Sequence, residues 1–234
     1  MAGQAPNKPL YKHASPYKEF RRRYREHWTK REFLSAVFLS SVFFAASVAI
    51  SFFAIQYATE RASNSVTDII LSNTTPMNVD GFFVFGTLFL VLFVLLVLIA
   101  HPKRIPFTLY SLGFFYIIRS LFISLTHIGP FPIPPDVTDW GIIAAHFLFG
   151  SDLFFSGHTG VPFLLALIFW REKGLRNMFL AWSVYMATIV LLGHYHYSID
   201  VASAFFITYT IFHISEWLFP RSRALFLRDE EQVK

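Results

Sequence analysis

The chain has 234 residues, of which 54% are hydrophobic and 15% charged, and its mean hydropathy is +0.47. Soluble domains carry about 25% charged residues, so this composition argues against a water-soluble globule, a disordered chain or a nucleic-acid-binding domain. The net charge is +5 at pH 7, and the absence of cysteine rules out disulfides, thiolate metal sites and cysteine nucleophiles.

Six apolar segments follow one another along the chain. A lipid core of about 30 Å takes roughly 20 helical residues, and the segments cover about residues 33–59, 81–100, 105–128, 156–170, 177–193 and 197–219. None alternates with the period of a barrel strand, and a backbone in lipid must satisfy its own hydrogen bonds. The sequence therefore predicts an all-α, polytopic membrane protein with six transmembrane helices.

The basic residues predict the orientation of these helices. Of the 20 Lys and Arg residues, 18 lie in segments that six spans would place on one side, and basic residues favour the cytoplasmic side. We therefore expect both termini to be cytoplasmic, with a basic N-terminal segment at 1–32, a membrane domain at 33–219 and a cytoplasmic tail at 220–234. The basic cluster at 21–25 is typical of a topology signal that contacts anionic lipid, and we expect no nucleic-acid partner.

Polar side chains gather near the opposite, exoplasmic face. Residues 156–159 (SGHT) open the fourth segment on that side, and residues 194–200 lie at the exoplasmic junction of the last two. Arg119 lies 15 residues after Arg104, about 22 Å along a helix, and so reaches the same region. Because an ionisable residue in a span costs several kcal/mol unless it is paired or hydrated, this convergence indicates a functional site.

The residue types suit a phosphate. Ser156 can cap the fourth helix, whose first amides and dipole favour an anion, and Gly157 lets a ligand approach the backbone. We expect Thr159 to share this phosphate site, and Arg119 offers a planar fork for two oxygens. His158 is suited to give a proton to a leaving oxygen.

A second pair of residues predicts a nucleophile. His196 and Asp200 are four residues apart, which on a helix places them on one face. The carboxylate would fix the tautomer of the imidazole and turn its other nitrogen outward to attack. Asp152, His194 and Tyr195 are candidate supporting residues.

Three alternatives stand beside this interpretation. His194 and His196 have the spacing of a zinc site, with His158 or Asp200 as a third ligand. Arg119 can instead extend to the headgroups or lock helices together. The same residues can also form a proton relay in a non-enzymatic lipid flippase or transporter.

Two segments also carry a family resemblance. Residues 150–159 (GSDLFFSGHT) and 194–201 (HYHYSIDV) closely resemble the two signature segments of the sphingomyelin synthase family, a branch of the type 2 phosphatidic acid phosphatase superfamily, and Arg119 resembles the arginine of that family's third span. The resemblance implies six helices, an exoplasmic site and transfer of a phosphorylated headgroup between lipids without a metal or other cofactor. It also implies a phosphohistidine intermediate on His196, with Asp200 as its orienting partner and His158 as the acid.

We therefore expect an integral membrane phosphotransferase whose partners are membrane lipids, phospholipids or sphingolipids. With water in place of an alcohol acceptor, the same site would act as a lipid phosphate phosphatase. A bacterial inner membrane and a eukaryotic endomembrane both fit the sequence.

Overall fold

The structure is a computed structural model of the chain, and it describes residues 28–132 and 153–233. These ranges are helical and contain no strand. The α-helices are α2 (Arg31–Glu60), α3 (Asp80–Ala100), α4 (Ile105–Leu125), α6 (Gly157–Ile168), α7 (Lys173–Leu192), α8 (Ser198–Leu218) and α9 (Pro220–Val233). Two short 3-10 helices, η1 (Leu71–Asn73) and η2 (Pro102–Arg104), lie in the connections.

Five of these helices are long and apolar enough to cross a membrane, namely α2, α3, α4 with η2, α7 and α8. Helix α6, which corresponds to the predicted fourth span, has 12 residues, a length of about 18 Å. The predicted segment 156–170 is therefore longer than its helix, and the third predicted segment, 105–128, ends as a helix at Leu125. Over residues 28–132 and 153–233 the structure is therefore all-helical, with five candidate spans and one shorter apolar helix.

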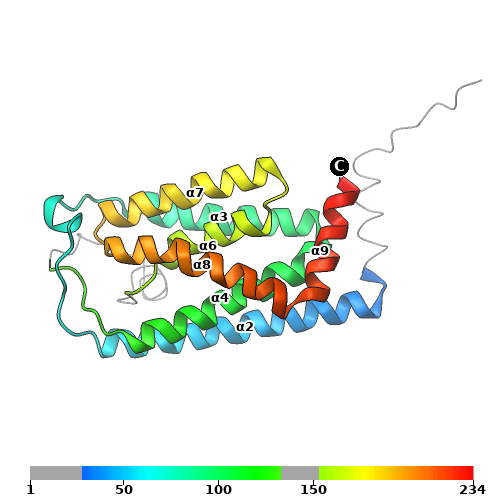
Figure 1. Ribbon diagram of the computed structural model, residues 1–234, viewed down its shortest axis with the longest axis horizontal. Coiled ribbons are helices and arrows are strands. Elements are labelled where there is room, and N and C mark those ends of the chain that lie inside the picture. Colours follow the sequence, from blue (N-terminus) through cyan, green and yellow to red (C-terminus); the bar gives the residue numbers. More distant parts are fainter. Residues whose placement is uncertain (1–27, 133–152, 234) are drawn as a thin grey trace, which may run out of the picture.

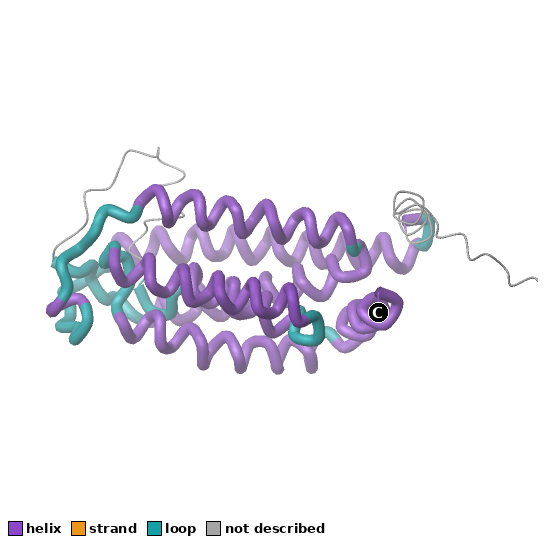
Figure 2. Tube along the Cα trace, turned by 90° about the horizontal axis from the view of Figure 1, so that it is seen from above, coloured by secondary structure: helices purple, strands orange, loops and turns teal. Residues whose placement is uncertain are grey.

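Helices α2, α3, α4, α6, α7 and α8 run side by side along one axis, and α9 turns across one end of the bundle (Figures 1 and 2). Successive helices run in opposite directions, α6 included, so that residues 61–79 and 193–197 lie at one end, which we call the site end. Helices η2 and α9 lie at the other end, which we call the basic end.

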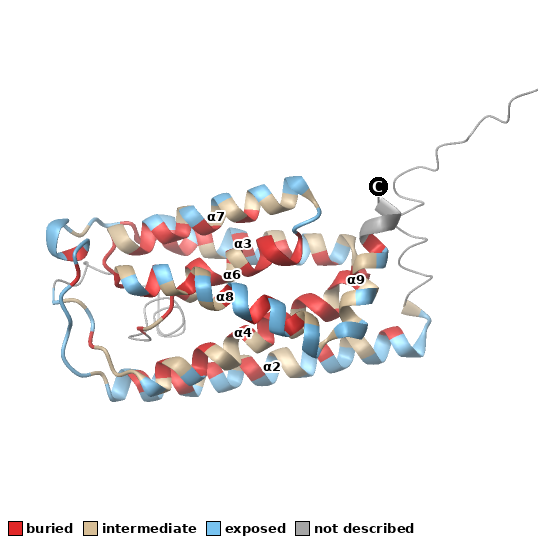
Figure 3. Cartoon of the chain, viewed as in Figure 1, coloured by how far each residue is buried: buried red, intermediate tan, exposed pale blue. Residues whose placement is uncertain are grey.

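Helix α6 lies at the centre of the bundle and packs against α4, α7 and α8. A Cβ atom on Gly160 would lie 2.8 Å from the Phe115 ring and 2.9 Å from Thr208 Oγ1, so glycine allows this close packing. The outward faces of α2 and α3 instead expose large apolar side chains such as Phe38, Phe53 and Phe82 (Figure 3). An exposed apolar surface of this extent suits contact with lipid.

A buried arginine, Arg104, joins the elements of the basic end through ion pairs. Arg104 is fully buried and forms ion pairs with Glu172, in the connection before α7, and with Asp229 on α9. Its guanidinium carbon lies 5.6 and 5.5 Å from the ring centroids of Phe169 and Phe226. The predicted tail from Pro220 onward forms helix α9. The Arg104–Asp229 pair docks this helix on the bundle.

Candidate active site

The start of α6 joins the two sequence motifs. Ser156 is the N-cap of α6, as predicted, and its Oγ accepts a hydrogen bond from the Thr159 amide at 3.4 Å. The Ser156 amide donates to the Asp200 carbonyl at 3.0 Å, which fixes the first turn of α6 against the first turn of α8. Phe154 and Phe155 both have positive φ angles, 115° and 38°, in the turn that leads the chain into this helix.

His196 and Asp200 form the predicted pair. The His196 Nδ1 atom lies 3.1 Å from the Asp200 carboxylate, and both side chains are buried. The prediction that both residues lie on one helix was wrong, because α8 begins at Ser198 and His196 precedes it. Asp200 is the third residue of α8, and its carboxylate also accepts from the Tyr197 amide at 3.1 Å in a capping box. A helix start therefore holds the carboxylate beneath the imidazole.

His158 lies in the first turn of α6 and faces His196. The centroids of the two imidazole rings are 6.3 Å apart, too far for a direct hydrogen bond and wide enough for a tetrahedral group between them. The His158 ring packs on Phe83 of α3 at 4.5 Å. Its Nδ1 atom is buried and has no hydrogen-bond partner within the described part of the chain.

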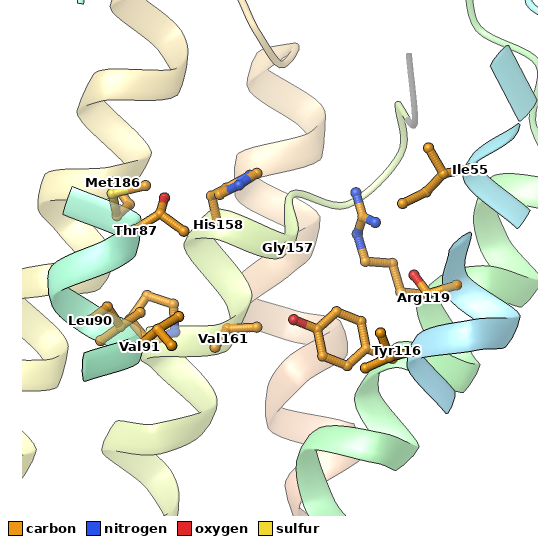
Figure 4. Close-up of a pocket in the computed structure, with 13 residues that line it drawn as sticks. Ile55, Thr87, Leu90, Val91, Tyr116, Arg119, Gly157, His158, Val161 and Met186 are labelled. Atoms are coloured by element: carbon orange, nitrogen blue, oxygen red, sulfur yellow. The ribbon is translucent and has the colours of Figure 1, made fainter. Parts of the chain in front are cut away.

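Arg119 approaches the start of α6 from α4. Its Nε donates to the Phe155 carbonyl at 3.2 Å, and the side chain is buried. A Cβ atom on Gly157 would lie 3.1 Å from the same Nε atom, so a larger residue at this position would have to displace the Arg119 side chain slightly. The arginine thus holds the turn before α6, and Figure 4 shows it and His158 on either side of Gly157.

A cavity of about 230 Å³ extends from Arg119 and His158 into the membrane domain. The cavity lies beside α6. The packed pair α2 and α4 is on one side of it, and the packed pair α3 and α7 is on the other. Its walls are mainly apolar, and they are formed by Val48, Ser51, Ile55, Thr87, Leu90, Val91, Tyr116, Arg119, Gly157, His158, Val161, Pro162 and Met186. His196 and Asp200 do not line this cavity and lie beyond His158.

Two acidic residues position the segment that carries His196. The Asp68 carboxylate accepts from Ser198 through its amide at 2.7 Å and its hydroxyl at 2.8 Å, and from the amides of Ile70 and Leu71. Burial by itself raises the pKa of Asp68, but these hydrogen bonds outweigh it and lower the pKa below its usual value. Asp68 therefore holds the start of α8 as a carboxylate.

The second acidic residue is Asp80, at the start of α3. Its carboxylate accepts a hydrogen bond from the Tyr195 hydroxyl. Burial, followed by this hydrogen bond, raises the pKa of Tyr195, so the hydroxyl remains a donor. Phe83, one turn further along α3, contacts the Tyr195 ring at 4.9 Å as well as His158.

The remaining predicted site residues lie at varying distances from this centre. His194 has a φ angle of 55° and its Nε2 lies 3.2 Å from Thr74 Oγ1, while its ring packs on Phe131. Burial lowers the pKa of His194, although the Asp68 charge opposes the shift. Thr159 is buried in the first turn of α6, where its carbonyl accepts from Ser183. Asp152 lies outside the described residues.

The zinc alternative finds no support in this geometry. Among the described residues, no group of three or more His, Cys, Asp or Glu side chains is placed to hold a metal ion. His194 is directed to Thr74 and Phe131, and His196 to Asp200.

The sequence interpretation missed Asp68, Asp80 and Phe83 as parts of the site. Neither Asp68 nor Asp80 is among the residues that the sequence predicts for the site. The available signal was the position of Asp80 at the first residue of an almost purely apolar helix, where a charge needs a partner. Phe83 gave no signal, because aromatic residues are frequent throughout the spans.

A comparison with known protein families finds a match that covers the candidate active site. Residues 150–217 match the family described as PAP2 superfamily, C-terminal, a range that contains His158, His196 and Asp200. No curated protein and no solved structure matches the chain. Over this part of the chain, the sequence is therefore similar to the PAP2 superfamily.

Proposed function

We propose that the protein is a membrane enzyme of the sphingomyelin synthase type, which transfers a phosphorylated headgroup from one lipid to the hydroxyl of another. The carrying observation is that His158 and His196 face each other at 6.3 Å, with Asp200 on the far nitrogen of His196. The apolar cavity beside His158 and Arg119 supports a lipid substrate over a small soluble one.

In the first step, Nε2 of His196 attacks phosphorus and the bond from phosphorus to the lipid oxygen breaks. His158 gives its proton to that leaving oxygen. The Asp200 carboxylate accepts a hydrogen bond from Nδ1–H of His196 and stabilises the positive charge that develops on the ring. Arg119 and the amides at the start of α6 bind the non-bridging oxygens.

In the second step, the acceptor hydroxyl attacks phosphorus and the nitrogen–phosphorus bond breaks. His158, now neutral, takes the proton of the acceptor, which returns both histidines to their initial state. Water in place of the alcohol gives hydrolysis by the same sequence of bonds. We propose that the site faces the exoplasmic side, because the basic residues gather at the other end of the bundle.

The test uses purified full-length protein, a phospholipid labelled in its headgroup, a ceramide or diacylglycerol acceptor and a metal chelator. The proposal expects label in the acceptor lipid, whereas a phosphatase releases the label to water. Rapid acid-free quenching and mass spectrometry should map the phosphorylated headgroup to His196. His196→Ala should abolish turnover, and His158→Ala should reduce it by roughly 10²–10⁴-fold.

The matched control is His213→Ala, which removes an exposed histidine from α8 that contacts Glu216, away from the site. It should retain full activity. Equal turnover by the wild type and His196→Ala, or lipid movement without headgroup cleavage, would reject the proposal and favour the flippase alternative. Loss of turnover on chelation would instead restore the zinc alternative.

A further inference from the structure

A second cavity lies at the basic end, at the opposite end of the bundle from the candidate active site. Its volume is about 900 Å³, and it is formed between the start of α2 and helix α9. Nothing in the proposed reaction uses it.

The cavity carries an excess of positive charge. Lys30, Arg221 and Arg228 line it, together with one acidic residue, Glu32. Within residues 28–132 and 153–229, none of the three cations forms an ion pair, whereas the neighbouring Arg104 and Arg223 are paired with carboxylates. Their charges therefore remain available to an anionic ligand.

The other walls are mainly apolar, with Ser35 and Ser222 as the polar exceptions, and they lead to the lipid-facing surface. Phe33 is buried at one wall, and Tyr110 is stacked on Phe219 at 4.5 Å. Leu39, also in the wall, is 56% exposed and adjoins the exposed Phe38 on the outer face of α2. A cationic rim above an apolar wall matches the shape of an amphiphile whose headgroup is anionic.

We propose that this cavity binds one anionic phospholipid from the leaflet at the basic end. The phosphate lies among Lys30, Arg221 and Arg228, and an acyl chain runs along Phe33 and Leu39. The chain's own N-terminal segment is a poorer occupant, because residues 1–27 carry seven Lys or Arg against two Glu and would add positive charge. The bound lipid would bridge α2 and α9.

The test is native mass spectrometry of the full-length protein, titrated with phosphatidylglycerol or with phosphatidylcholine of the same chains. We expect one retained phosphatidylglycerol per chain and weaker retention of phosphatidylcholine. The double variant Arg221→Gln with Arg228→Gln should weaken phosphatidylglycerol binding about thirtyfold, since each cation near an anionic lipid contributes about a fivefold effect. The matched control, Lys173→Gln with Arg176→Gln, removes the same charge at the same end outside the cavity and should bind as the wild type does.

Three results would overturn the proposal. Equal losses in both double variants would indicate general attraction to an anionic surface. Competition by glycerophosphoglycerol, which has the headgroup without chains, at the same concentration as the lipid would indicate a soluble anion. No retained phosphatidylglycerol in the wild type would indicate another occupant, such as the N-terminal segment. Headgroup transfer is measured separately, so either proposal can fail without the other.

Discussion

The Asp200 carboxylate makes two contacts whose proposed roles can be separated chemically. One carboxylate oxygen both faces His196 Nδ1 and accepts from the Tyr197 amide, each at 3.1 Å. In the proposed mechanism the first contact orients the imidazole and stabilises its positive charge, while the second contact caps α8. An asparagine oxygen can accept from the amide but cannot balance an imidazolium charge.

We therefore predict that Asp200→Asn lowers kcat by roughly 10²–10⁴-fold and changes the free energy of unfolding by less than about 1 kcal/mol. Headgroup transfer and thermal unfolding in detergent measure the two effects. Asp68→Asn is the comparison, because Asp68 holds Ser198 without touching either catalytic histidine. It should lose about 1–3 kcal/mol of stability with a smaller loss of kcat, and the same pattern in both variants would contradict the assigned role of Asp200.

The Asp80–Tyr195 hydrogen bond carries a second prediction. It fixes the His196 segment to α3, whose Phe83 packs on His158. Tyr195→Phe keeps the ring contact with Phe83 and removes the donor, and Asp80→Asn removes the charge. Each should lower kcat roughly tenfold with little change in KM, and the double variant should lose no more than the larger single effect.

A double-mutant cycle on kcat checks this coupling. Tyr185→Phe is the matched control, since the Tyr185 hydroxyl on α7 donates to the Phe82 carbonyl on α3 without contacting a catalytic residue. Independent, additive losses in Tyr195→Phe and Asp80→Asn would show that the two residues act separately.

These contacts show which parts of the candidate site could be predicted from the sequence. The His196–Asp200 contact was predictable from spacing within one motif, although its helical explanation was wrong, because the two residues bracket a helix start. The contact of Asp80 with Tyr195 was not predictable, because 115 positions separate them and only the packing of α3 against α7 brings them together. A motif predicts contacts between residues close in sequence. Contacts between residues far apart in sequence, which position those pairs, depend on how the helices pack.

At the scale of elements, α6 shows the limit of hydropathy. Its sequence is apolar over the predicted 156–170, but the helix has 12 residues. The capping hydroxyl of Ser156 sets its start, and neighbouring helices cover its sides, so it need not match the lipid thickness alone. The five longer candidate helices lie close to their predicted bounds because each exposes apolar side chains along its length.

The Asp229 carboxylate attaches helix α9 to the bundle. Asp229 accepts from Arg104 Nε at 2.8 Å and lies 3.2 Å from His101 Nδ1. Burial by itself raises the pKa of Asp229, but hydrogen bonds from His101 and Arg104 and the Arg104 charge lower it to about 2 from 3.8. A lowered carboxylate pKa stabilises the fold above the unfolded pKa and ceases to do so as the pH falls through the folded pKa.

Asp229→Asn should therefore reduce stability by about 1–2 kcal/mol, allowing for solvent screening, at pH values above about 4. The difference from the wild type should shrink as the pH falls below about 4 and vanish only below about pH 2, as measured by thermal unfolding in detergent. Glu216→Gln, which breaks a more exposed pair with Arg223, should cost less than about 1 kcal/mol. A difference that persists unchanged to pH 2 would contradict the ionic contribution of Asp229.

For the whole molecule, the question is whether the shorter α6 counts as a crossing. If it did not, the connection before α7 would lie on the same side as residues 153–156. Yet Arg104, before α4, pairs with Glu172, before α7, which places both connections at the basic end. Since α2 starts and α9 lies at that end too, we predict six crossings with both termini on the cytoplasmic side.

The absence of cysteine from the chain makes this topology directly measurable. Single variants Asn73→Cys at the site end and Gly174→Cys at the basic end place one thiol at exposed positions, and Gly174 has open space around its Cα. A membrane-impermeant maleimide should label Asn73→Cys in intact cells or sealed right-side-out vesicles, and Gly174→Cys only after permeabilisation. Labelling of Gly174→Cys from outside would mean that α6 turns back before crossing, and the basic end could not then be a single cytoplasmic face, because the Arg104–Glu172 pair would have to break.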